Sequence, residues 1–127
     1  MMNGSVYEKM TLGEKQTADF LTSLSIFWRF HHPVTIYDEE NLPRIYYPDF
    51  FLPQFGVYIE VCGSNRKEEY DRRKKIYFAN NIKVIFVETF KDSVKWKTFL
   101  LNALYSIQVE RMAILYTSIG QKIFSVK

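Results

Sequence analysis

The sequence predicts an α/β fold in which helices cover one mixed β-sheet. Three observations lead to this prediction. A Thr-x-x-Glu capping box at 11–14 precedes an amphipathic helical run. Three runs rich in aromatic and β-branched residues follow, separated by turn residues. A charged helical run then precedes a compact apolar run of strand length. The order is helix, three-stranded antiparallel meander, helix, parallel strand and long C-terminal helix.

Each element has its own local signal. The capping box predicts a helix over about 12–25. The strand-like runs are 26–37, 44–52 and 57–62, with a polar turn at 38–41 and a Pro/Gly turn at 53–56. A charged helix over about 66–80 ends at two asparagines, and a right-handed crossover would lay the strand 82–87 parallel to 57–62. The final helix runs from about 92 to 116, and the tail at 122–126 is interpreted as a short edge strand.

Length and composition favour one globular domain over residues 1–127. The net charge of +3 is too small to establish a nucleic-acid partner but permits a local basic face. A single cysteine excludes an internal disulfide and a cysteine-based zinc site. The sequence also shows no signal-like start and no long apolar run. We therefore expect an intracellular, cytoplasmic protein with neither a membrane partner nor a small-molecule cofactor.

Three carboxylates are predicted to converge at one edge of the sheet. Glu60 lies within an apolar strand, where a carboxylate is costly unless it has a partner. The turn at 53–56 brings Asp49 to the level of Glu60, and Glu14 can reach the sheet from the first turn of its helix. With backbone carbonyls from Glu60 and Cys62, these oxygens would suit Mg²⁺ or Mn²⁺. Glu14 is also explained by its capping role alone.

The residues Pro48-Asp49 and, eleven positions later, Glu60-Val61-Cys62 resemble the PD-(D/E)XK nuclease superfamily. The likeness to archaeal Holliday-junction resolvases and very-short-patch-repair-like endonucleases covers about 11–88 and includes the order of elements. It implies a restriction-endonuclease-like core and a Mg²⁺-dependent DNA endonuclease. By resemblance, Glu14, Asp49 and Glu60 are metal ligands.

Cys62 occupies the position of the family's motif lysine, and a thiol cannot supply the charge of an ammonium group. Lys74, on the same helical face as two tyrosines, is our first candidate for a relocated catalytic lysine, and Lys67 is the second. Arg73 and Tyr77 weakly match a Gln-x-x-x-Tyr pattern that some relatives carry on this helix. A solvated helix with internal ion pairs is the simpler interpretation of this charged run.

The basic residues of this helix form a candidate phosphate-contacting surface: Arg66, Lys67, Arg72, Arg73 and Lys75. DNA is therefore the expected partner, and the wide apolar face of the last helix suits a homodimer. Two other functions stay open: a catalytically inactive module of the same fold that binds DNA or protein, and a scaffold for a protein partner. Cys62 has no nearby His and Asn signature of a nucleophile. His31 and His32 are interpreted as structural, because neighbouring strand residues point to opposite faces.

Overall fold

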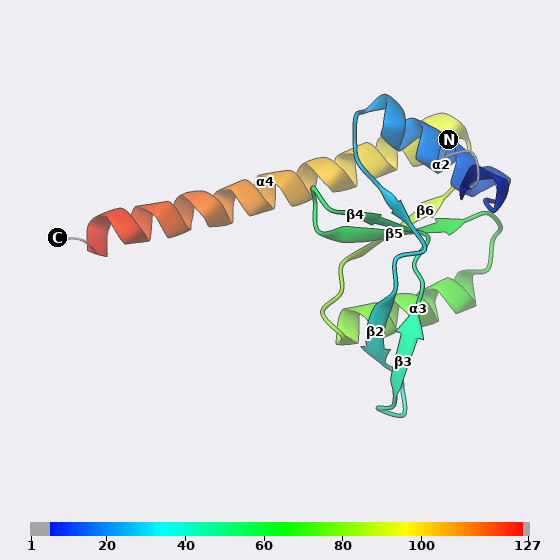
Figure 1. Ribbon diagram of the computed structural model, residues 1–127, viewed down its shortest axis with the longest axis horizontal. Coiled ribbons are helices and arrows are strands. Elements are labelled where there is room, and N and C mark those ends of the chain that lie inside the picture. Colours follow the sequence, from blue (N-terminus) through cyan, green and yellow to red (C-terminus); the bar gives the residue numbers. More distant parts are fainter. Residues whose placement is uncertain (1–5, 126–127) are drawn as a thin grey trace.

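The computed structural model describes residues 6–125 and contains a mixed four-stranded sheet between two layers (Figure 1). The strand order is β1-β4-β5-β6. The first three strands are antiparallel, and β6 is parallel to β5. Helices α2 and α4 cover one face, and α3 with a separate β2–β3 hairpin covers the other. The predicted mixed α/β class and the parallel addition of the last strand are confirmed.

Helix α2 spans Leu12–Ser23 and begins at the predicted capping box. The Thr11 backbone N–H donates to the Glu14 carboxylate at 2.8 Å, and the Glu14 N–H donates to the Thr11 hydroxyl at 3.2 Å. Gly13 lies so close to the sheet that an added Cβ would collide with the Thr89 hydroxyl and approach Val61. The first turn of α2 is therefore held against the ends of β5 and β6.

Each of the first two predicted strands is divided in two. The run 26–37 contains β1 (Arg29–Phe30) and β2 (Val34–Tyr37), and the run 44–52 contains β3 (Pro43–Tyr46) and β4 (Phe50–Leu52). Strands β1 and β4 join the main sheet, whereas β2 and β3 pair only with each other. The breaks lie beside Pro33 and Pro48, which lack the N–H that a continuous ladder needs. The antiparallel meander is thus β1, β4 and β5, with a hairpin inserted.

The third strand and its crossover follow the prediction closely. Strand β5 spans Val57–Cys62, helix α3 spans Lys67–Ala79 and strand β6 spans Val84–Glu88. Asn80 caps α3, and Asn81 adopts a left-handed φ of 58°, which asparagine tolerates. The side chain of Asn80 also binds both backbone polar groups of Tyr37, at 2.8 and 2.9 Å. This contact attaches the hairpin to the end of α3.

Alternation along β5 separates two apolar clusters. Val57, Ile59 and Val61 face α2 and α4, whereas Cys62 faces α3. The larger cluster joins α2, the sheet and the first half of α4. Its fully buried members are Ala18, Leu21, Phe50, Leu52, Val57, Ile59, Val87 and Leu100. The smaller cluster comprises Ile36, Cys62, Ile76, Tyr77 and Phe86. Both faces of the central strand are therefore covered.

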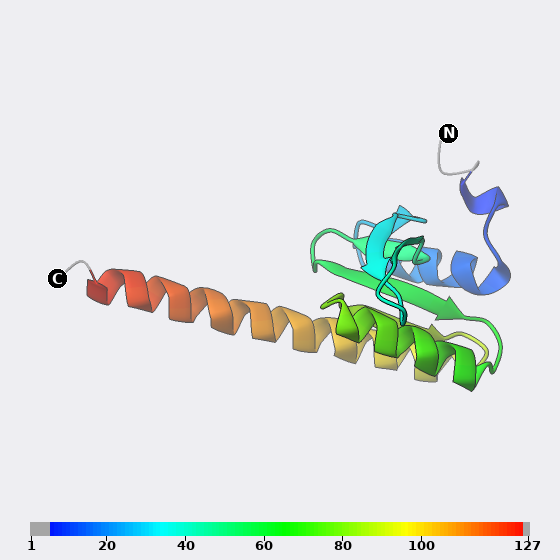
Figure 2. The ribbon, with the colours of Figure 1, turned by 90° about the horizontal axis from the view of Figure 1, so that it is seen from below.

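Helix α4 is longer than predicted and spans Ser93–Ser125. Figures 1 and 2 show that its first half lies on the sheet and its second half extends well beyond it. The predicted edge strand at 122–126 is wrong for 122–125, which continue the helix, and residue 126 lies outside the described residues. Among residues 6–125, no helix combines the length and apolar character needed to cross a bilayer.

Candidate metal centre

Asp49 lies immediately before β4, next to the middle of the sheet. Its carboxylate Oδ2 accepts a hydrogen bond from the Val61 backbone N–H at 2.6 Å, and its backbone carbonyl accepts one from His31 N–H at 3.0 Å. The Phe50–Ile59 pair fixes the register, which puts Asp49 at the level of Glu60. The predicted proximity of these two positions is therefore present in the backbone.

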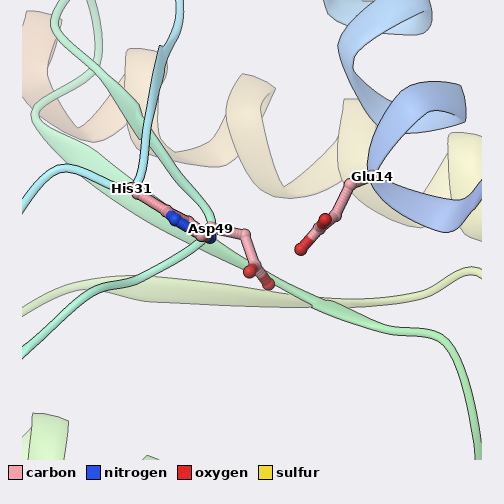
Figure 3. Close-up of side chains that lie close together, drawn as sticks. All are labelled: Glu14, His31 and Asp49. Atoms are coloured by element: carbon pink, nitrogen blue, oxygen red, sulfur yellow. The ribbon is translucent and has the colours of Figure 1, made fainter. Parts of the chain in front are cut away.

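Glu14 and Asp49 meet as predicted, and His31 joins them (Figure 3). Their ligand atoms all lie within 4.8 Å of one another. Glu14 is buried, Asp49 is half-buried and His31 is exposed, so the group opens to solvent on the histidine side. A pair of carboxylates with one imidazole is a donor set that Mn²⁺ accepts readily and that also suits Mg²⁺ through its oxygens.

The electrostatics of this group favour a bound cation or proton. The pKa of Asp49 is raised to about 8, mainly by burial, then by a hydrogen bond with Glu14 and by the charge of Glu60. The Val61 N–H opposes this shift but does not cancel it. At neutral pH Asp49 therefore tends to hold a proton. A divalent cation would compete with this proton for the same oxygens.

His31 is a residue that the sequence argument did not assign to the site. It follows β1 with a left-handed φ of 52°, and its ring stacks on Phe30 with centroids 3.9 Å apart. His32 instead stacks on Phe51, with centroids 5.0 Å apart. The two histidines thus contact different rings. His31 itself leaves the strand through its left-handed φ, and its side chain lies beside Asp49.

Glu60 is not part of the Glu14–His31–Asp49 group. Its Oε2 accepts hydrogen bonds from Arg73 Nη1 at 3.0 Å and from the Tyr77 hydroxyl at 2.9 Å. Burial first, and then the charge of Glu60, raise the pKa of the Tyr77 phenol, which keeps it protonated as a donor. The costly carboxylate in β5 thus has its partners on α3. The charge of Glu60 acts on Asp49, but the two carboxylates have different partners. Glu60 is bound by α3, whereas Asp49 contacts the Val61 N–H and Glu14.

Cys62 is buried beneath α3 and is not a nucleophile. Burial, followed by the charges of Glu88 and Glu60, raises the pKa of its thiol to about 12. Its backbone carbonyl, expected to bind the metal, accepts a hydrogen bond from the Thr89 hydroxyl at 3.3 Å. The Lys74 charge opposes the shift at Cys62, and both residues line the same groove.

The two candidate lysines line one groove with Cys62. The groove has a volume of about 540 Å³ and lies between α3, β6 and α4. The Lys74 ammonium stands over the Phe86 ring, 5.2 Å from its centroid, and 4.0 Å from an Asp71 carboxylate oxygen. It is therefore directed into the groove rather than onto Glu60. Arg73, not Lys74, is the cation of α3 that reaches Glu60.

Most of the predicted phosphate-contacting residues form ion pairs. Arg66 pairs with Glu69 at 3.8 Å, and Arg72 pairs with Glu39 at 3.0 Å. Arg73 pairs with both Glu60 and Glu69. Lys67 and Lys75 are exposed. The basic side of α3 is therefore weaker than its sequence suggests, because acidic neighbours neutralise much of its charge.

Comparison of the chain with protein-family models, curated proteins and solved structures finds no match. The site is therefore interpreted from its own geometry.

Proposed function

We propose that this chain is a divalent-cation-dependent nuclease of restriction-endonuclease-like type that hydrolyses phosphodiester bonds in DNA. The convergence of the Glu14 and Asp49 carboxylates with His31 is the observation that carries the proposal. Their order along the chain and their place beside a β4–β5 pair support it, as does the parallel β6 after a crossover helix. The resemblance of Pro48-Asp49 and Glu60-Val61-Cys62 to the superfamily motif supports the substrate class.

Glu14, Asp49 and His31 would hold Mg²⁺ or Mn²⁺, and the ion would supply charge neutralisation and an activated water. Water would add to phosphorus as the phosphorus–oxygen bond to the leaving sugar breaks, and the proton that this water loses would pass through solvent to the leaving oxygen. Lys74 and Lys67 line the neighbouring groove and would contact the phosphate charge.

One observation favours a second function, that of a catalytically inactive module that binds DNA or a protein. Cys62 stands where the superfamily has its lysine, and Arg73 with Tyr77 neutralises Glu60. In an active member Glu60 would be a metal ligand. If Arg73 remains on Glu60 in the complex with nucleic acid, only the Glu14–His31–Asp49 group is left to bind an ion.

A cleavage assay with Mg²⁺ or Mn²⁺ on branched and linear DNA tests the nuclease proposal. We expect cleavage by the wild type and a loss of about a hundredfold or more in Asp49→Asn, which removes a charged ligand of the ion, and in Lys74→Met, which removes a cation that would contact the phosphate. Lys95→Met is the control, since it removes an exposed charge that the proposed site does not use. A wild type that cleaves none of these substrates would contradict the proposal, and Cys62→Lys would then test whether an ammonium at this position restores cleavage.

A further inference from the structure

Helix α4 presents an apolar stripe on the side away from the body of the protein. Its six residues are between 38% and 71% exposed: Leu101, Tyr105, Val109, Met112, Tyr116 and Ile119. At about 100° per residue they fall within roughly 80° of the helix surface. Leu100 and Leu104, which face the sheet, are nearly fully buried. The stripe therefore lies opposite the face that the core uses.

The last three residues of the stripe, Met112, Tyr116 and Ile119, belong to the second half of α4. That half of the helix extends beyond the sheet (Figure 2). The helix is tied to the body near its middle, where Arg111 donates to the Gln54 carbonyl at 2.8 Å and Glu110 pairs with Lys83 at 3.4 Å. The part of α4 beyond this contact, residues 112–125, is so short that it would be only marginally stable as an isolated helix in water. A partner that covers the stripe would stabilise the extended half.

Small residues flank the stripe at seven-residue intervals: Ser106, Ala113 and Gly120. Gly120 lies inside the helix, where glycine costs about 1 kcal/mol relative to alanine. A Cβ added there would meet no atom within 4 Å, so the monomer provides no steric reason for this glycine. A second helix that approaches closely along this edge would provide one.

We propose that the stripe is the contact between two copies of this chain, whose α4 helices pack against each other about a two-fold axis. A second copy offers the same straight stripe of the same length, so the two surfaces match along their whole extent. No charged residue occurs from Met112 to Gln121, which excludes like-charge repulsion and leaves no charge for a nucleic acid to contact. The six side chains would remove roughly 600 Å² per copy from water, which reaches the lower limit of stable dimers.

Sedimentation equilibrium on the full chain tests this dimer. We expect twice the 15.2 kDa chain mass at about 100 µM wild type. Met112→Glu should weaken dimerisation at least about 30-fold, because it buries an unpaired charge in the contact. Ser118→Glu is the matched control: it adds the same charge to an exposed residue on the opposite side of the helix and should leave the dimer unchanged.

Gly120→Leu separates the proposed contact from an effect on folding. In a dimer the leucine should crowd the second helix and shift the mass toward the monomer, although it raises intrinsic helix propensity. Circular dichroism should show that all three variants keep their helix content. A monomeric wild type, or a dimer that tolerates both Met112→Glu and Gly120→Leu, would overturn the proposal.

Discussion

Asp49→Asn should stabilise the protein at alkaline pH. The pKa of Asp49 is raised from 3.8 to about 8, mainly by burial and then by its hydrogen bond with Glu14. The folded state therefore binds this proton more tightly than the unfolded state does. The free energy of unfolding should fall as the pH rises from about 4 to about 8 and should stay low above that range. Asparagine does not titrate, and it can still accept the Val61 N–H and donate to Glu14.

The size of the effect follows from the shift. One pKa unit corresponds to about 1.4 kcal/mol, so a shift of this size has an upper limit of about 6 kcal/mol. Asp49 is only half-buried, and Glu14 and His31 can adjust around an ionised carboxylate, so solvent screening reduces this value. We expect a difference of about 2–3 kcal/mol between pH 5 and pH 8.5.

Urea unfolding at these two pH values, with a chelator present, measures the difference directly. The wild type should lose about 2–3 kcal/mol of unfolding free energy and Asp49→Asn less than about 1 kcal/mol. Glu40→Gln, which removes an exposed carboxylate, should behave like the wild type. An equal loss in the wild type and in Asp49→Asn would show that another group titrates, and the electrostatic account of this site would be wrong.

Three further substitutions test the contacts around the site by urea unfolding. Arg73→Met should cost about 2 kcal/mol or more, because it leaves Glu60 buried without its cation, whereas Tyr77→Phe should cost about 1–2 kcal/mol for one lost hydrogen bond. Gly13→Ala should destabilise the protein by at least about 1 kcal/mol, because its Cβ would collide with Thr89. Thr89→Ala in the same chain should recover part of that loss, and no recovery would contradict the steric explanation.

Much of the fold could be predicted because its signals are local. The capping box at Thr11 and Glu14 fixed the start of α2, and the two asparagines after α3 marked its end. The division of the strands was missed because the prediction treated each run as continuous, although Pro33 and Pro48 interrupt the ladder. His31 takes a left-handed φ that histidine does not require. The extension of α4 to Ser125 was missed because Thr117, Ser118 and Gly120 have lower helix propensities, so the local helical signal ends near 116.

The relative positions of Asp49 and Glu60 were predictable, because their spacing along the chain determines them. Asp49 and Glu60 share a level because a short turn joins β4 and β5, and this is a property of sequence. The partner of each carboxylate depends on packing that the sequence does not encode locally. His31 was set aside on an alternation argument that assumes a continuous strand. Arg73 was assigned to DNA, but the buried charge of Glu60 needs a cation and Arg73 is the one within reach.

The Arg73–Glu60 pair separates the two proposed functions. In this structure the Arg73 guanidinium lies 3.0 Å from a carboxylate oxygen of Glu60 and neutralises its charge. An approaching phosphodiester would therefore meet little free negative charge outside the Glu14–His31–Asp49 group. Arg73 is 39% exposed, however, so its guanidinium can leave the buried Glu60 carboxylate when another cation replaces it there. A nuclease would gain from that exchange, because Glu60 would become available to an ion and Arg73 to the phosphate. A binding module would gain nothing from this exchange, because it needs no ion at Glu60 and the intact Arg73–Glu60 pair already neutralises this buried carboxylate.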